Sequence, residues 1–353
     1  MAYTTIDDPT AYFQTITWTG NGSDPRTITF DGNSDMQPDW VWEKSRSLAY
    51  QHNLYDSVRG GGKGLDLPAA AVEVSNNANG YISAFTSDGF TLTAGSTNNE
   101  LLNENTTTYV GWGWKAGTSF TNDASGTGIG TIDSAGSVST ASGFSIVSWT
   151  GTGSAGTIAH GLGKLPKMII AKQRNSTANW VVYFLDTTIA NNNVNNYLEL
   201  NTTIASTGDS GARWGAYANY STTTFGVGTD AATNADGSTY IAYVFSDIQG
   251  YSKFSSYTGN GNADGNFIYT GFKPAFIMIK RTDAAADWEM YDNKRDGFND
   301  DNPPFYANTT GAEGSNDRID ILSNGFKIRA SSGNLNASGG TYIYMAFAEN
   351  PFV

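Results

Sequence analysis

One ordered set of landmarks occurs three times along this chain, and this repetition constrains the fold more than any other feature. Each set opens with an aromatic residue followed by Thr-Gly, continues through a proline and an apolar run, and closes on a Thr-Tyr pair. The opening aromatics are Trp18, Trp149 and Tyr257, the prolines are Pro38, Pro166 and Pro274, and the closing tyrosines are Tyr109, Tyr240 and Tyr342. A fixed order of this kind is the signature of internal repeats. It predicts three modules in tandem.

The boundaries of the modules follow from composition. We predict module 1 over residues 1–117, module 2 over 143–250 and module 3 over 251–353. Residues 118–142 are small, polar and rich in Gly, Ser and Thr, which is typical of linkers. No such spacer separates modules 2 and 3. We therefore expect those two modules to pack together and module 1 to be joined by a hinge.

Short strands dominate the local patterns. Residues 326–329 alternate apolar and basic side chains, as a half-buried strand does, whereas residues 168–171 and 276–279 are apolar on both faces, as covered strands are. Turn pairs such as Asn-Gly and Asp-Gly separate the runs, and no helical period is evident. The predicted fold class is all-β, with three tandem antiparallel β-sandwich modules of jelly-roll type.

Composition excludes several classes of protein. The chain has no cysteine and two histidines, which removes disulfide scaffolds, Cys-ligated metals and three-His metal sites. Its net charge of −13 disfavours nucleic acid and anionic membranes as partners. The first residues lack the pattern of a signal peptide, and no apolar run is long enough to span a bilayer. We expect no membrane insertion and no cofactor.

Several strings resemble a known family. Module 1 carries PDWVWEKSRS at 38–47, YDSVRGGGKGL at 55–65 and YVGWGWKAG at 109–117, and module 3 carries diverged copies such as YDNKR at 291–295. These strings are similar to those of uncharacterised marine bacteriophage proteins that share a domain of unknown function. The resemblance implies a structural protein of the virion, in a tail or fibre. It supplies no catalytic residue.

No constellation of residues predicts catalysis. A glycosidase needs two carboxylates about 5–10 Å apart, but Asp56 and Asp292 recur beside the repeated tyrosines, and Asp186 lies near the third. This recurrence favours a structural role. His52 and His160 lack the surroundings of a catalytic triad. The loop at 260–265 matches only the first half of a calcium loop, so we predict neither a catalytic residue nor a metal site.

Binding residues are expected where the modules differ, because loops on a rigid β scaffold carry most binding sites. Trp214 lies in a Gly-flanked loop specific to module 2, with Tyr217 and Tyr220 beside it. His52 occupies a position that is Trp in the other modules. These four residues are the predicted binding residues. The paired tryptophans at 40, 42, 112 and 114 are predicted to form core.

Three functions fit these observations. The first is host attachment by a tail fibre or similar appendage through surface polysaccharide, with the modules supplying avidity. The second is a purely architectural role among other virion proteins. The third is a polysaccharide depolymerase. For the first, we expect a non-enzymatic protein of the virion that forms a homo-oligomer, for which a trimer is plausible.

Overall fold

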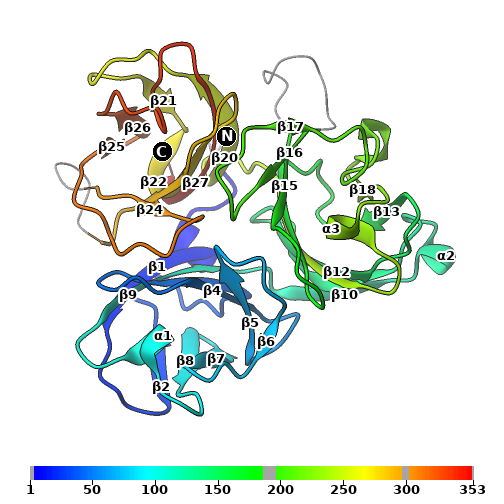
Figure 1. The fold of residues 1–353 in the computed structure, drawn as a ribbon, viewed down its shortest axis with the longest axis horizontal. Helices are drawn as coiled ribbons and strands as arrows, with labels where there is room; N and C mark the ends of the chain where they lie inside the picture. The colour runs from blue at the N-terminus through cyan, green and yellow to red at the C-terminus, as the bar shows by residue number, and fades with distance from the viewer. Residues whose placement is uncertain (1–3, 186–195, 296–301, 352–353) are drawn as a thin grey trace.

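The structure is a computed structural model that describes residues 4–185, 196–295 and 302–351. It is built from antiparallel sheets, so the all-β prediction is confirmed. Three lobes surround a common centre, and each lobe contains one large sheet and one small sheet (Figure 1). Lobe 1 is blue and cyan, lobe 2 is mainly green, and lobe 3 runs from yellow to red.

Lobe 1 has a large sheet of order β1-β9-β3-β4-β5-β6 and a small sheet of order β2-β8-β7. In β9 the tryptophans face the centre, and glycines occupy the opposite face. A Cβ on Gly113 would lie 2.5 Å from the Phe30 ring, so glycine is needed for that ring to pack. The elements are η1 (Pro9–Ala11), β1 (Phe13–Thr19), β2 (Arg26–Thr29), β3 (Trp40–Ser45), β4 (His52–Asp56), β5 (Lys63–Leu67), β6 (Val74–Ser75), β7 (Tyr81–Thr86), β8 (Gly89–Thr93), α1 (Glu100–Asn103) and β9 (Thr108–Trp114).

Lobe 2 has the longest sheet, of order β10-β11-β12-β19-β14-β15-β16-β17, and a pair β13-β18. Residues 118–142, expected to form a linker, hold two strands that extend this sheet beyond β12. The elements are β10 (Thr118–Asn122), α2 (Ala124–Thr127), β11 (Ser134–Ser139), β12 (Phe144–Thr150), β13 (Gly156–Ala159), β14 (Met168–Gln173), β15 (Val181–Phe184), β16 (Asn196–Glu199), β17 (Thr207–Gly208), η2 (Tyr217–Asn219), β18 (Thr224–Val227), α3 (Ala231–Asn234) and β19 (Thr239–Phe245).

Lobe 3 has a large sheet of order β20-β27-β22-β23-β24 and a small sheet of order β21-β26-β25. Pro274 lies at a register irregularity between β22 and β27, where a missing N–H is tolerated. The elements are β20 (Ser252–Thr258), β21 (Phe267–Tyr269), β22 (Phe272–Arg281), β23 (Trp288–Asp292), β24 (Phe305–Tyr306), β25 (Ile319–Leu322), β26 (Gly325–Ile328) and β27 (Thr341–Pro351).

One face of each large sheet contributes to a single central core. Trp40 stacks on Tyr243 of lobe 2 with ring centroids 4.1 Å apart, and Trp114 packs against Phe347 of lobe 3 at 5.7 Å. The predicted core tryptophans 40, 42, 112 and 114 are all fully buried there. The alternation of strand side chains explains this, because the opposite faces of the same strands enter three further cores, each confined to one lobe.

The opening and closing landmarks of each set pack against each other. The rings of Trp18 and Tyr109 stack 5.5 Å apart, and the corresponding pairs in lobes 2 and 3 stack at 5.1 and 4.9 Å. Each of the three closing tyrosine hydroxyls accepts one backbone N–H and donates to one backbone carbonyl. The repeated aromatics therefore hold equivalent loops in the three lobes.

The junctions between lobes also use equivalent positions. Trp180 of lobe 2 donates its indole N–H to the Asp66 carbonyl of lobe 1 at 3.1 Å. Trp288 of lobe 3 donates to the Glu199 carbonyl of lobe 2 at 2.8 Å. His52 of lobe 1 completes the circle, with Nε2 3.1 Å from the Tyr306 carbonyl of lobe 3. Lobe 1 is thus hydrogen-bonded to both other lobes, rather than attached only through the segment that follows it.

Buried ions strengthen two of the junctions. The Asp56 carboxylate pairs with Arg59 of its own lobe and accepts the Tyr243 hydroxyl of lobe 2 at 2.8 Å. The Asp292 carboxylate pairs with Arg295 and accepts the Trp112 indole N–H of lobe 1 at 3.0 Å. The recurrent aspartates therefore have the structural role expected for them. Asp186 lies outside the described residues.

Candidate functional site

The loop residues predicted to bind a ligand lie mostly inside lobe 2. Trp214 is fully buried, and Tyr220 is 7% exposed. The Tyr220 hydroxyl donates to the Trp214 carbonyl at 2.8 Å, and its ring stacks on Tyr183. The side chain of Tyr217 lies outside the described residues. Trp214 and Tyr220 therefore present little surface to a ligand.

His52 is fully buried as well, at the junction with lobe 3. Its Nδ1 accepts the Trp42 indole N–H at 2.9 Å, which leaves the proton on Nε2 for the Tyr306 carbonyl. Burial, followed by the nearby Lys44 ammonium, lowers the pKa of His52 to about 3. The neutral imidazole thus donates a hydrogen bond to a carbonyl of the neighbouring lobe, as the indole N–H does at the equivalent positions in the other lobes. It has no surface available for a ligand.

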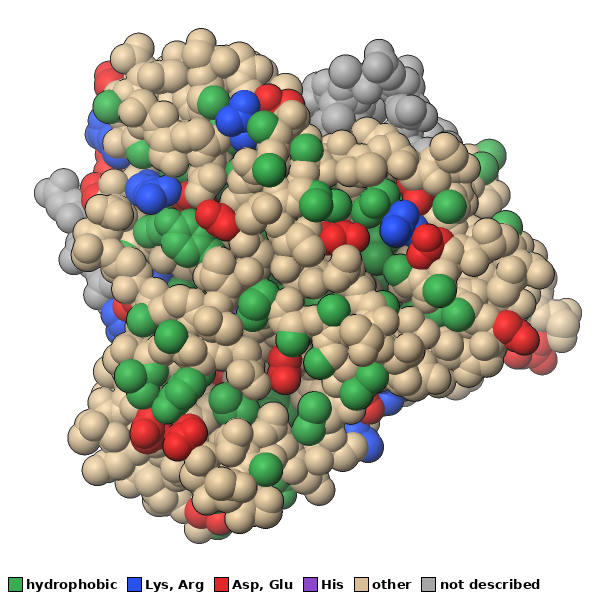
Figure 2. Space-filling model, viewed as in Figure 1, with side chains coloured by type: hydrophobic (Ala, Val, Ile, Leu, Met, Phe, Trp, Pro, Cys, Tyr) green, Lys and Arg blue, Asp and Glu red, His purple; other side chains and the backbone are tan. Residues whose placement is uncertain are grey.

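The surface offers different aromatic side chains. On the face in Figure 2, most of the area is backbone and uncharged side chains, with acidic and basic groups scattered among them. Among the described residues, the most exposed aromatics are Phe267 at 46% and Tyr269 at 51%. Both lie on β21, two residues apart, so they point to the same side of the strand. Ile268 between them is buried.

The strand registers show that these two aromatics are special to lobe 3. The inward Ile268 lies opposite Phe326, as Ile28 lies opposite Phe90 and Ile158 opposite Phe225. The neighbours of Ile28 along its strand are both threonine, and those of Ile158 are threonine and a buried alanine. The fold therefore does not require large side chains at these positions. The exposed Phe and Tyr there are therefore candidates for contact with a ligand.

A groove of about 400 Å³ lies between β20 and β21 beside these rings. The buried Phe254 faces the central core, so Lys253, Ser255 and Tyr257 lie on the opposite face of β20, toward the small sheet. The groove is lined by Lys253, Ser255, Ser256, Tyr257, Asn266, Phe267, Ile268, Tyr269 and Tyr344. Aromatic rings flanked by hydroxyl and amide groups suit a ligand with both apolar and polar faces.

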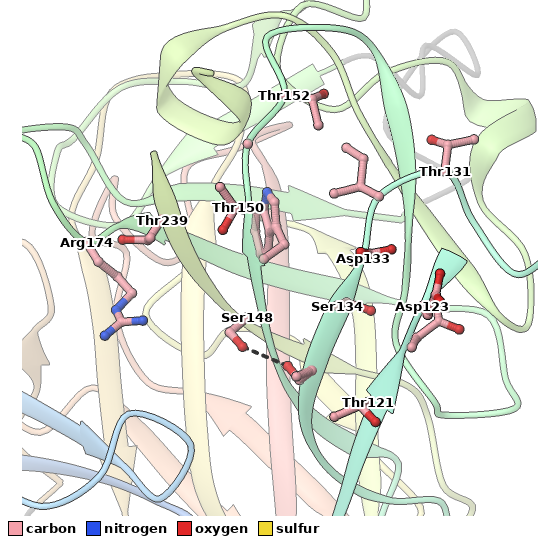
Figure 3. A pocket seen from close by; sticks show the side chains of 15 residues that line it. Thr121, Asp123, Thr131, Asp133, Ser134, Ser148, Thr150, Thr152, Arg174 and Thr239 are labelled. Atoms are coloured by element: carbon pink, nitrogen blue, oxygen red, sulfur yellow. Dashed lines mark hydrogen bonds between the residues drawn. The ribbon is translucent and has the colours of Figure 1, made fainter. Parts of the chain in front are cut away.

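A larger trough of about 760 Å³ crosses the large sheet of lobe 2 (Figure 3). Thr150 lies opposite Thr239, and the backbone N–H of Arg174 donates to the Thr239 carbonyl at 2.8 Å, so these side chains form one row. The guanidinium of Arg174 is held by Glu73 of lobe 1 at 2.8 Å. Serine and threonine supply seven of the 15 residues that line the trough, and the one tryptophan among them, Trp149, is only 4% exposed.

Two carboxylates occupy one end of this trough, but both serve the fold. Asp133 accepts the Ala124 backbone N–H at 2.9 Å, and Asp123 accepts the Gly126 N–H at 3.0 Å as the cap of α2. Hydrogen bonds from the Ser125 hydroxyl and from Gly126 lower the pKa of Asp123. A general acid for glycoside cleavage needs a raised pKa, so the geometry here suits capping better than acid catalysis.

Carboxyl groups with raised pKa values lie elsewhere, in the interior. Burial raises the pKa of Glu43 well above its usual range, against the hydrogen bond from Asn53. Burial likewise raises the pKa of Glu289, which is opposed by Arg318 at 2.7 Å. Both side chains are fully buried. Neither carboxyl group can reach a polymer at the surface.

The loop at 260–265 forms a hydrogen-bonded turn. Asn260 Oδ1 accepts the Asn262 backbone N–H and the Asn336 side-chain amide, both at 2.9 Å. Within the described residues, no group of three or more His, Cys, Asp or Glu is arranged to hold a metal ion. In that same part of the chain, no helix has the length and apolar character needed to cross a membrane.

The fold and the groove define an all-β protein with an exposed aromatic surface groove. The chain belongs to the family described as a domain of unknown function, DUF7483, whose model matches residues 8–351. Neither the curated proteins nor the solved structures contain a match.

Proposed function

We propose that this chain is a non-enzymatic attachment protein of a bacteriophage virion, part of a tail fibre or similar appendage, that binds surface polysaccharide of its host. The resemblance to marine phage proteins supports the virion as its location. One structural observation carries the attachment role: Phe267 and Tyr269 lie exposed beside a polar groove. Aromatic faces pack against the apolar faces of sugar rings, and hydroxyl and amide groups bind their hydroxyls.

The same proposal includes three tandem modules of sandwich type. In support, each large sheet and its small sheet share one hydrophobic core within a lobe. The second module would begin at residue 118 rather than 143, because β11 pairs with β12 along its length. Association of several chains, such as a trimer, would present several grooves and raise the avidity for a polymer.

The test uses labelled, purified protein on intact host cells, with extracted surface polysaccharide as competitor. The key variant is F267T/Y269T, which introduces the residue that the first lobe carries at the same register positions, Thr27 and Thr29. The matched control is T27A/T29A in that first lobe. We expect saturable binding that the polysaccharide competes away, and at least about a fivefold loss in the aromatic double variant alone, since each ring contributes roughly 0.5–1.5 kcal/mol.

Two other outcomes would replace the proposal. Absence of binding by folded wild-type protein would favour the architectural role among virion proteins, and the next measurement would be its capture by those proteins. Release of reducing sugar ends from the polysaccharide would favour a depolymerase.

A further inference from the structure

We infer that the groove of lobe 3 recognises an acidic sugar, one that carries a carboxylate or sulfate group. This inference rests on the proposed function and names the class of glycan that the site takes. It comes from the charge that lines the groove, considered together with the aromatic pair. Lys253 is the one charged residue among the groove-lining residues, and none of them is Asp or Glu.

The lysine is placed to reach a ligand on the rings. Lys253 lies opposite Ala346 in the register of β20 and β27, on the face of β20 that carries Ser255 and Tyr257. Among the described residues, no carboxylate lies within ion-pair distance of its Nζ. The Lys253 charge acts on the Asp247 carboxylate, which itself accepts the Phe254 backbone N–H at 2.7 Å. The Lys253 ammonium therefore has donors to offer a bound anion.

The other charges near β21 are already paired. Lys327, opposite Phe267, lies 2.9 Å from Asp264, and Arg329 lies 3.0 Å from the same carboxylate. Arg329 also pairs with Asp320 at 2.5 Å. These ion pairs carry no net charge. The Lys253 ammonium is therefore the charge that a ligand in the groove would meet. The net charge of −13 resides on the whole chain, and salt at physiological strength screens it beyond about 8–10 Å.

The lysine, like the aromatics, occurs at this position in one lobe only. In the shared register, the position of Lys253 corresponds to Gln14 in β1 and Ser145 in β12. In lobe 2 the outer edge of β12 is covered by β11, and in lobe 1 the Gln14 amide holds the turn at Gly32. A cation, two exposed rings and an open groove therefore coincide in lobe 3 alone. These three differences from the other lobes would not be expected to meet in one groove by chance.

The ligand that fits is a pyranose chain bearing acidic groups. Its sugar faces would pack on Phe267 and Tyr269, and its hydroxyls would meet Ser255 and Asn266. The acidic group would accept a charge-assisted hydrogen bond from Lys253 Nζ. A neutral glycan would use the rings equally well but gain nothing from the lysine. The lysine thus sets the preference between the two classes.

The experiment measures binding of the full chain to two matched pairs of soluble oligosaccharides. Each pair shares one backbone and differs in a carboxylate: polymannuronate with β-1,4-mannan, and β-1,4-glucuronan with cello-oligosaccharide. The variants are K253M, F267T/Y269T and the charge-matched control K164M, whose lysine lies in an exposed turn of lobe 2. Titration calorimetry at low and high salt gives affinity, and circular dichroism checks that each variant folds.

We expect the wild-type protein and K164M to prefer the acidic member of at least one pair. K253M should weaken binding of that member about fivefold, and high salt should do the same, as expected for one partly exposed ion pair. Binding of the neutral member should not change with either. Equal affinity for both members, or an unchanged preference in K253M, would overturn the inference while leaving the proposed function intact. If F267T/Y269T bound the acidic and neutral members as tightly as the wild-type protein does, both the inference and the proposed function would be overturned. Absence of binding to any oligosaccharide would overturn both as well.

Discussion

The buried contact between Tyr243 and Asp56 offers the sharpest test of how the lobes are joined. Tyr243 lies in lobe 2 and is fully buried. Its hydroxyl donates to Asp56 Oδ2 at 2.8 Å and accepts from Arg59 Nη2 at 3.3 Å, both in lobe 1. The substitution Tyr243→Phe removes this hydroxyl and keeps the ring that stacks on Trp40. It therefore changes one polar contact between lobes without opening a large cavity.

The expected loss of stability follows from the charges on Asp56 and Arg59, the two partners of the Tyr243 hydroxyl. A hydrogen bond to a charged group contributes roughly 1.5–3 kcal/mol, compared with about 0.5–1.5 kcal/mol for a neutral pair. Asp56 keeps the Arg59 side chain at 2.5 Å and the Arg59 backbone N–H at 2.8 Å, so the carboxylate is not left unpartnered. We expect Tyr243→Phe to lower the free energy of unfolding by about 2 kcal/mol.

Urea unfolding followed by tryptophan fluorescence is the suitable assay, because urea adds no ions that would screen the pair. The matched control is Tyr220→Phe, which removes a buried hydroxyl that donates to a neutral carbonyl within lobe 2. Its expected loss is about 1 kcal/mol. If Tyr243→Phe costs no more than Tyr220→Phe, the charged junction does not hold lobes 1 and 2 together as argued.

Three further predictions follow from the structure. Gly151→Ala should lower the melting temperature by several degrees, because the added Cβ would overlap the Ala235 carbonyl oxygen, whereas Gly311→Ala, whose Cβ would make an ordinary contact of 3.6 Å with the Thr309 hydroxyl, should have little effect in the same thermal scan. Burial lowers the pKa of Lys172 to about 8, so the folded state loses this proton before the unfolded state, and stability should rise from pH 8 to 10; urea titrations should show a smaller rise in Lys172→Met. The unfolded state binds a proton at His52 near pH 6.5, well above the folded pKa of about 3, so stability should fall by up to roughly 1.4 kcal/mol per pH unit below pH 6.5. The substitution His52→Gln should make that fall less steep, and an unchanged slope would refute the buried neutral imidazole.

The sequence predicted the strand class because turn pairs and alternation are local signals. It could not show where the tryptophans of β3 and β9 pack. A strand that is apolar on both faces looks the same whether its second cover is a small sheet or a neighbouring lobe. The central core, which joins Trp40 to Tyr243 across more than half of the chain, depends on contacts that no local pattern records.

Composition was a poor guide for residues 118–142. Their Gly, Ser and Thr content is typical of linkers, yet Ser134–Ser139 pairs with residues 144–149 of β12. Backbone hydrogen bonds depend little on the side chain, so an available strand edge outweighs a flexible composition. Phe267 and Tyr269 could have been found by aligning the three sets at the buried Ile28, Ile158 and Ile268, because the neighbouring residues differ there.

The closed circle of lobes imposes an order on biosynthesis. Lobe 1 leaves the ribosome first, with the tryptophans of β3 and β9 exposed on one face. Their partners at Tyr243 and Phe347 are translated much later. Until then the nascent chain carries an uncovered apolar surface of the kind that makes partly folded proteins aggregate or recruit chaperones. Truncation before the last strand therefore destabilises more than lobe 3, because it also leaves the apolar face of lobe 1 without the cover that Phe347 supplies.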